Sequence, residues 1–87
     1  MAEVKIYSSM LCGFCWRAKA LLDKKGIAYE EVDVTMDAGK KKEMTSLAGG
    51  KTSVPQIFID GAHVGGCDEL YALDGAGRLD QMLGVHG

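Results

Sequence analysis

A Cys-x-x-Cys motif between a strand pattern and a helix pattern constrains this sequence more than any other feature. Cys12 and Cys15 follow an alternating apolar run at Val4 and Ile6, and they open a segment whose apolar residues recur at helical spacing. The start of a helix carries unpaired N–H groups and partial positive charge, which stabilise a thiolate. We therefore predict that Cys12 is the nucleophile of disulfide exchange and that Cys15, one helical turn later, is the resolving thiol.

Two other roles fit the motif by itself. It could form half of a zinc site, but the other candidate ligands, Cys67, His63 and His86, lie far along the chain and are not paired at ligand spacing. It could also place two inert thiols in the core, since free cysteine packs as a small hydrophobic residue. The strand-then-helix context favours redox chemistry over both alternatives.

The composition is that of a small globular domain with mixed charge. The chain has 87 residues and a net charge of -2 at pH 7, so it lacks the basic surface of a general nucleic-acid binder. Glu3 and Lys5 interrupt any apolar signal core, and no apolar run has the length of a membrane span. Three cysteines do not suggest a secreted disulfide scaffold. We expect one domain over residues 1–87, cytoplasmic, without a membrane or nucleic-acid partner.

Periodicity and turn residues predict alternating strands and helices. The first strand, helix and second strand form a β-α-β unit, which implies a parallel pair with a right-handed crossover. Asp60-Gly61 predicts a hairpin turn, and Gly26 predicts the end of a helix. The three lysines at 40–42 are expected on a solvated helix face rather than in a patch for an anionic partner. We predict strands over 3–7, 27–34, 56–59 and 62–64. We predict helices over 13–25, from a cap at Thr35 or Asp37 to Leu47, over 68–73 and around 79–83, with a break at 74–77. The helix that ends at Leu47 is expected to be weakly amphipathic, with Met44 and Leu47 on its apolar face.

The predicted order of elements, with the Cys-x-x-Cys motif opening the first helix, resembles the thioredoxin fold. Three local motifs narrow the resemblance to the glutaredoxin family: Cys12-Gly13-Phe14-Cys15, Ser53-Val54-Pro55 and Gly65-Gly66-Cys67-Asp68. The match covers essentially the whole chain and resembles the small bacterial dithiol glutaredoxins. It implies an α/β, thioredoxin-like fold with a four-stranded mixed sheet flanked by helices.

The resemblance also implies a glutathione site built from these segments. Pro55 would follow a cis peptide bond, and the backbone of Val54 would pair with the glutathione peptide as a strand edge. The helix start at Gly66 would offer N–H groups to the γ-glutamyl carboxylate, and Asp68 would hold the α-ammonium group. Lys51 would contact the glycyl carboxylate. The implied glutathione-binding residues are Phe14, Lys51, Val54, Pro55, Gly66, Cys67 and Asp68.

Plainer roles stay open for three of these features when the residues are considered alone. Pro55 could simply begin a strand in the trans form. Gly65-Gly66 could be a turn before a helix, and Lys51 could be an isolated, solvated lysine.

The chain departs from the family pattern at four positions, and it carries a third thiol outside the Cys-x-x-Cys motif. Gly13 and Phe14 stand where the family usually has Pro and Tyr, and Ser9 stands where many members have a lysine that would favour glutathione and the thiolate. Trp16 is expected either at the rim of the site or in the core. The spare thiol, Cys67, is expected to be structural, with oxidation as the alternative because a helix start could favour its thiolate.

The implied activity is that of a glutathione-dependent thiol–disulfide oxidoreductase, which reduces protein disulfides and glutathione mixed disulfides through the Cys12 thiolate. An alternative from another class is a dimer that binds a [2Fe-2S] cluster through Cys12 of each chain and two glutathione thiols. A third is a thioredoxin-like protein reduced by a flavoenzyme, against which the segment 65–68 argues. We expect glutathione and glutathionylated or disulfide-containing proteins as partners, and a monomer unless a cluster bridges two chains.

Overall fold

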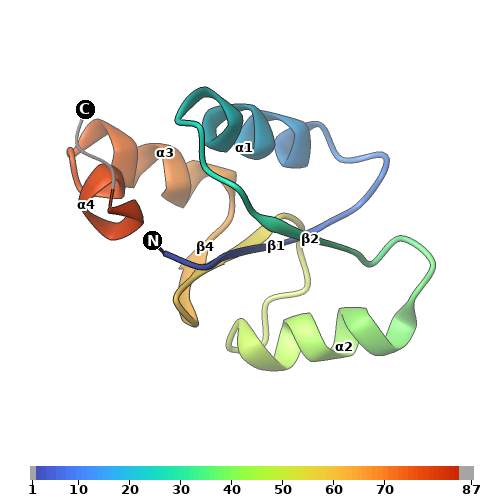
Figure 1. The fold of residues 1–87 in the computed structure, drawn as a ribbon. Coiled ribbons are helices and arrows are strands. Elements are labelled where there is room, and N and C mark those ends of the chain that lie inside the picture. The colour runs from blue at the N-terminus through green and yellow to red at the C-terminus, as the bar shows by residue number, and fades with distance from the viewer. Residues whose placement is uncertain (1, 85–87) are drawn as a thin grey trace.

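The computed structural model describes residues 2–84, which form a sheet with helices on both faces (Figure 1). The elements in chain order are β1 Val4–Ser8, α1 Gly13–Lys24, β2 Glu30–Asp33, α2 Ala38–Leu47, β3 Gln56–Ile59, β4 Ala62–Gly65, α3 Cys67–Gly75 and α4 Leu79–Leu83. The four strands lie in the order β2-β1-β3-β4, in which β1 and β2 run parallel and the other neighbours antiparallel. This is the predicted α/β architecture with a mixed sheet. Within residues 2–84, no helix is long and apolar enough to cross a bilayer.

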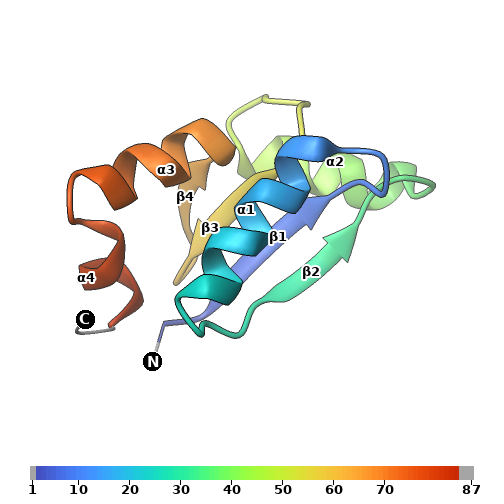
Figure 2. The same ribbon diagram turned by 90° about the horizontal axis from the view of Figure 1, so that it is seen from above.

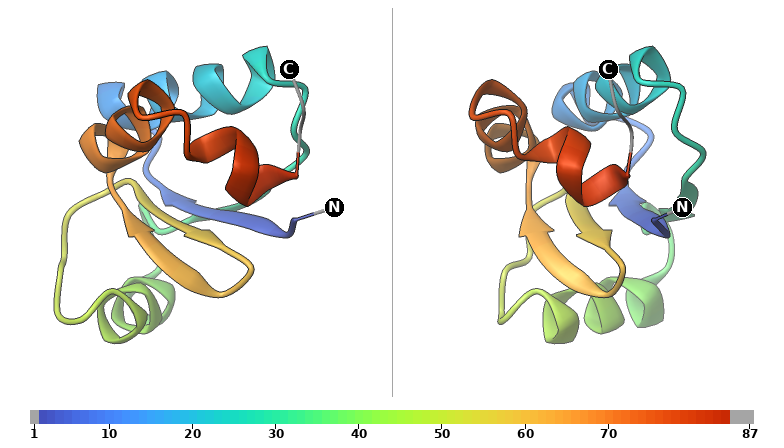
Figure 3. Two further views of the ribbon diagram at one scale, coloured as in Figure 1. Left: turned by 90° about the vertical axis from the view of Figure 1, so that its left-hand side faces the viewer. Right: turned by 60° about the vertical axis from the view of Figure 1, so that its left-hand side comes forward.

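The two faces of the sheet carry separate apolar clusters, because successive residues of a strand point to opposite faces. In β1, Val4 and Ile6 pack in the cluster that includes residues of α1, α3 and α4, whereas Tyr7 packs with α2. Figure 3 shows α2 on one side of the sheet and the other three helices on the opposite side. The cluster beneath α1 therefore determines where that helix begins relative to the central strands.

Helix α1 forms where the sequence predicts it. Four residues on one face are buried: Cys15, Ala18, Leu21 and Leu22. Gly26 follows the last turn with a φ of 69°, as expected for a helix stop. Lys25 Nζ lies 2.7 Å from Asp74 Oδ1 and 2.6 Å from Asp80 Oδ1, so its ammonium group joins the end of α1 to α3 and α4.

The second strand is shorter than the predicted range of 27–34. The parallel register pairs Lys5 with Glu30, so residues before 29 lie beyond the start of β1 and have no strand beside them. Val34 keeps a backbone hydrogen bond from its N–H to the Ser8 carbonyl, at 2.9 Å, but follows the end of the strand. The apolar pattern could not reveal this limit because it depends on the register of two strands.

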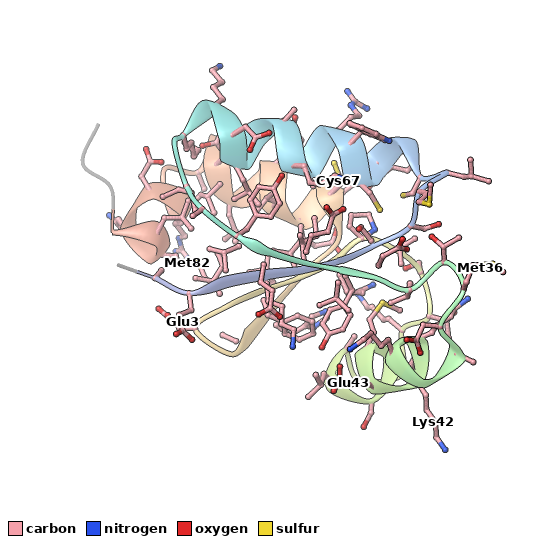
Figure 4. All side chains as sticks on the ribbon, turned by 45° about the vertical axis from the view of Figure 1, so that its right-hand side comes forward. Glu3, Met36, Lys42, Glu43, Cys67 and Met82 are labelled. Carbon is pink, nitrogen blue, oxygen red and sulfur yellow. The ribbon has the colours of Figure 1, made fainter. Side chains whose placement is uncertain are left out.

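Helix α2 confirms one of its two predicted caps and corrects its predicted apolar face. The Asp37 side chain accepts a hydrogen bond from a backbone N–H of the first turn. Met44 and Ala48 are buried against the sheet, but Leu47 is exposed, so the predicted stripe through Leu47 is wrong. Lys42 points away from the sheet, as expected for a solvated helix face (Figure 4).

Helix α3 is longer than predicted at its C-terminal end. It continues through Gly75, so only the last two residues of the predicted break at 74–77, Ala76 and Gly77, lie outside the helix. Asp74 stays helical while its carboxylate pairs with Lys25, and Gly77 makes the reversal with a φ of 73°. The second glycine of this short segment, rather than the first, ends the helix.

The β3–β4 hairpin brings the last strand to the start of α3. Its turn is the predicted Asp60-Gly61 pair, with φ angles of 51° and 81°. At the end of β4, Gly65 has a φ of 120°, which residues with a side chain rarely adopt. A Cβ atom on Gly65 would lie 2.8 Å from Glu69 Oε1. Glu69 accepts a hydrogen bond from the Gly66 N–H at 3.3 Å, so this packing fixes the first turn of α3.

We predict that Gly65→Ala lowers the free energy of unfolding by about 1–3 kcal/mol, because it combines an unfavourable φ with displacement of Glu69. Gly75→Ala is the matched control, since a Cβ atom there meets nothing within 4 Å and its φ is not positive. That control should be neutral or stabilising by up to about 1 kcal/mol. Urea denaturation of both variants measures the difference. Equal stability of the two variants would contradict this account of Gly65.

Candidate active site

Cys12 occupies the N-cap of α1, at the carboxyl end of β1 (Figure 2). Its sulfur accepts a hydrogen bond from the Cys15 N–H at 3.2 Å, which is one of the donors that a helix start leaves without an intrahelical partner. The same sulfur donates to the Val54 carbonyl at 3.5 Å. The thiolate can keep the first of these bonds but not the second, which needs the thiol proton. Cys12 is partly exposed, so a disulfide can reach it.

Cys15 lies one turn further along α1 and is fully buried. Burial, the main cause, and the interaction with Cys12 together raise the pKa of Cys15 to about 12. Lys19 opposes this shift only weakly. At neutral pH Cys15 therefore holds its proton, and the two cysteines of the motif are chemically unequal.

The loop before β3 brings a backbone edge to Cys12. The Val54–Pro55 peptide bond is cis, as the family resemblance implied. Pro55 is buried while Val54 is partly exposed, and the Val54 carbonyl accepts the hydrogen bond from Cys12. This places a short segment of backbone beside the reactive sulfur.

A cavity of about 260 Å³ lies beside the motif, between this loop and the start of α3. All seven residues predicted to bind glutathione line it: Phe14, Lys51, Val54, Pro55, Gly66, Cys67 and Asp68. They come from three separate segments of the chain, which only the fold brings together. The remaining lining residues are Ser53, Gln56 and Glu69. We call this space the α3 cavity.

Charges of both signs surround the α3 cavity. Asp68 lies in the first turn of α3, where the helix dipole favours negative charge and the first N–H groups have no intrahelical acceptor. Lys51 Nζ lies 3.9 Å from Glu69 Oε1, and both side chains are about half exposed. Such an exposed pair is weak, so the ammonium group of Lys51 can turn to an anionic ligand.

The structure decides between the two positions that the sequence allowed for Trp16. Its side chain is 64% exposed, so it belongs to the rim of the site and not to the core. Its ring centroid lies 4.5 Å from Lys19 Nζ.

Ser9 supplies no charge, but its carbonyl accepts a hydrogen bond from the Cys12 N–H at 3.2 Å. Gly13 has open space where a Cβ would stand.

Oxidation, the alternative to the expected structural role of Cys67, is not supported. Cys67 is buried in the cluster beneath α1, toward the end of that helix that carries the motif (Figure 4). Burial raises the pKa of the Cys67 thiol, which disfavours the thiolate that oxidation requires.

Among the residues that the structure describes, no group of three metal-ligating side chains could hold a metal ion, and His86 lies outside those residues.

Sequence reasoning missed two hydrogen-bond networks next to the site. In the first, Gln56 is buried, donates to the Ser53 carbonyl at 2.9 Å and lies 2.7 Å from His63 Nε2, so it holds the loop before Val54. The sequence offered one sign of this network, because Gln56 is a polar residue in an otherwise apolar strand.

The second network joins α1 to β2. Glu31 Oε2 accepts hydrogen bonds from Lys19 Nζ at 2.7 Å and from Ser8 Oγ at 2.6 Å. Lys19 stands one turn after Cys15, which would have been a signal, but its partner on β2 could be found only from the fold.

Comparison with known proteins gives consistent matches. The family model described as Glutaredoxin matches residues 4–64. The chain is 52% identical over 83 residues to Glutaredoxin 3 of Escherichia coli, which covers 95% of this chain and 99% of that protein. It is 51% identical over 79 residues to Glutaredoxin 1 of Rickettsia prowazekii, covering 90% and 83% of the two chains.

Solved structures give the same result. The solution structure of a glutaredoxin from Brucella melitensis superposes with a TM-score of 0.84 at 46% identity, covering 95% of this chain and 89% of that one. The crystal structure of a buckwheat glutaredoxin–glutathione complex superposes with a TM-score of 0.85 at 30% identity, covering 95% and 77%.

We predict that iodoacetamide modifies one of the three cysteines of the folded protein at neutral pH. Cys12 is the partly exposed thiol, whereas Cys15 and Cys67 are buried and have raised pKa values. Intact mass should show one adduct in buffer and three in denaturant, and Cys12→Ser should show none in buffer. Modification of Cys15 or Cys67 as fast as Cys12 would contradict this difference.

Proposed function

This chain belongs to the glutaredoxin family of thiol–disulfide oxidoreductases, and we propose that it reduces glutathione mixed disulfides and protein disulfides through the Cys12 thiolate, with glutathione as co-substrate. The observation that carries the proposal is the position of the Cys12 sulfur. It accepts the Cys15 N–H at the start of α1 and lies next to the Val54 backbone, which lines the α3 cavity. A nucleophile with an adjoining ligand cavity is what glutathione-linked exchange requires.

The proposed reaction begins when the Cys12 thiolate attacks the glutathione sulfur of a mixed disulfide. A new S–S bond forms between Cys12 and glutathione, the old S–S bond breaks, and the substrate leaves as a thiolate that takes a proton from water. A second glutathione thiolate then attacks the bound glutathione sulfur, which releases the Cys12 thiolate and oxidised glutathione. The raised pKa of Cys15 supports glutathione as the resolving thiol in this cycle.

For a protein disulfide, Cys12 would form its mixed disulfide with the protein and Cys15 would resolve it. Cys15 would have to lose its proton as it attacks, and its burial makes that step slow. We therefore propose that this chain turns over glutathione mixed disulfides faster than protein disulfides.

The α3 cavity is the proposed glutathione site. The Val54 backbone would pair with the glutathione peptide. The N–H groups of Cys67 and Asp68, in the first turn that follows Gly66, would face the γ-glutamyl carboxylate, while the Gly66 N–H keeps its hydrogen bond to Glu69. Asp68 would hold the α-ammonium group and Lys51 the glycyl carboxylate. The buckwheat relative was solved as a glutaredoxin–glutathione complex, which supports a ligand of this kind. Phe14 and Pro55 would supply apolar contact to the cysteinyl part.

A cluster-binding dimer is the alternative proposal. Among the described residues one chain offers no three-ligand group, so a [2Fe-2S] cluster would need Cys12 from two chains together with glutathione thiols. The partly exposed Cys12 and the open space at Gly13 fit the close approach of a second chain. Without a cluster, we propose that residues 1–87 act as one monomeric domain.

We predict that Cys12→Ser abolishes glutathione-dependent reduction of a small mixed disulfide, whereas Cys15→Ser retains most of it, because external glutathione resolves the intermediate. A coupled assay with glutathione reductase measures both rates. Comparable loss in the two variants would contradict resolution by glutathione.

After anaerobic incubation with iron, sulfide and glutathione, a colourless monomer would remove the cluster alternative, and a coloured dimer lost only in Cys12→Ser would support it.

We predict that Asp68→Asn and Lys51→Ala each raise the apparent KM for glutathione by about fivefold, with a smaller effect on kcat, because each removes one charge contact. Lys42→Ala is the matched control, since it removes a lysine charge from the far face of α2. It should leave KM unchanged. An unchanged KM in both site variants would contradict the assignment of these two residues.

A further inference from the structure

A second cavity, of about 290 Å³, flanks the Cys-x-x-Cys motif on the side of β2. Figure 2 shows the strands in the order β2-β1-β3-β4. Since the residues of the α3 cavity come from the side of β3 and α3, the two cavities lie on opposite sides of Cys12. Two residues that line the second cavity are bonded to Cys12: the Ser9 carbonyl accepts its N–H, and the Trp16 N–H donates to its carbonyl at 3.3 Å. We call this space the Trp16 cavity.

The walls of the Trp16 cavity carry a net negative charge. Its charged lining residues are Lys19, Glu31 and Asp33, so two carboxylates face one ammonium group. Lys19 holds the pKa of Glu31 below its ordinary value, and hydrogen bonds from Thr35 lower that of Asp33, so both carboxylates are ionised at neutral pH. The hydrogen bonds that the described residues donate to Glu31 end on Oε2 and those to Asp33 end on Oδ1, so the other oxygen of each carboxylate can accept a hydrogen bond from a ligand.

The rim of the Trp16 cavity is apolar and exposed. Trp16 is 64% exposed, Met10 is 70% exposed, and the adjacent Leu11 is 94% exposed. Thr35 holds this loop in place, because its hydroxyl accepts a hydrogen bond from the Met10 N–H at 2.9 Å and donates one to Asp33 at 2.6 Å. Exposed apolar side chains grouped beside a reactive sulfur are typical of an interaction surface.

We propose that the Trp16 cavity is a subsite for a basic side chain near the reactive cysteine of a protein substrate. Its methylene groups would lie against Trp16 and Met10, and its cationic end would meet the carboxylates of Glu31 and Asp33. The inference rests on the proposed function, because the substrate cysteine must reach Cys12. When the glutathione of a mixed disulfide lies in the α3 cavity, the substrate cysteine joined to its sulfur lies beside the motif, and residues next to that cysteine can reach the Trp16 cavity on the other side of Cys12.

This assignment gives the two cavities different roles. Glutathione is too small to fill both, so the Trp16 cavity is open to the polypeptide that carries the disulfide. The net negative charge of its walls favours a lysine or arginine side chain over an acidic one. An apolar side chain would make only the contacts with the apolar rim. The chain would then select protein substrates by residues close to their cysteine.

The test uses three synthetic peptides, each glutathionylated at one cysteine and carrying lysine, leucine or glutamate on both sides of it. We expect kcat/KM for the lysine peptide to exceed that for the glutamate peptide by about fivefold at low salt, and the ratio to fall at high salt. Asp33→Asn keeps the acceptor oxygen for Thr35 but removes the charge, so it should lower the ratio toward one. Asp23→Asn, the control at the far end of α1, should keep the wild-type ratio.

Trp16→Ser tests the apolar rim and should slow the lysine and leucine peptides. A wild-type ratio near one, an unchanged ratio in Asp33→Asn, or a leucine peptide that reacts faster than the lysine peptide would overturn the proposal. Glutathionylated cysteine serves as a substrate without neighbouring side chains. If the wild-type protein fails to reduce even that compound, the proposed function itself is wrong, and the two failures are therefore distinguishable.

Discussion

The hydrogen bond from the Cys15 N–H to the Cys12 sulfur depends on where α1 begins, and the active site depends on that bond. The cluster that packs Ala18 and Leu22 against Ile6 fixes α1 over the sheet, so the first turn lies at the carboxyl end of β1. The loop with Val54 reaches the same point from β3, and α3 begins on its other side. Each segment is placed by packing elsewhere in the domain, and the reactive sulfur stands where they meet.

Local patterns were sufficient to predict the order of strands and helices and the position of the Cys-x-x-Cys motif at the start of α1. The cis peptide bond before Pro55 and the ligand role of the segment at Gly66 followed from the family resemblance instead, and the residues that it implied line one cavity. The limits of β2, the exposure of Leu47 and the partner of Lys19 depend on strand register and on how helices rest on the sheet. No local pattern contains that information, so these features required the folded structure.

The two cysteines show how burial divides one motif into two chemical roles. Only three residues apart, they differ in exposure because Cys12 ends the loop and Cys15 lies on the buried face of α1. The partly exposed sulfur can meet a substrate, while the buried one keeps its proton until a disulfide forms beside it. In the proposed cycle, this difference favours an external thiol as the resolving group, and its main cause is the burial of one face of α1.

Strand β2 has a consequence for how the protein behaves at high concentration. It lies at the edge of the sheet, where its outer N–H and C=O groups could pair with a strand of another molecule. Three of its four residues are acidic, namely Glu30, Glu31 and Asp33. Two copies that joined through this edge would set rows of carboxylates against each other, which opposes the pairing. The acidic strand therefore protects an open sheet edge against self-association and aggregation.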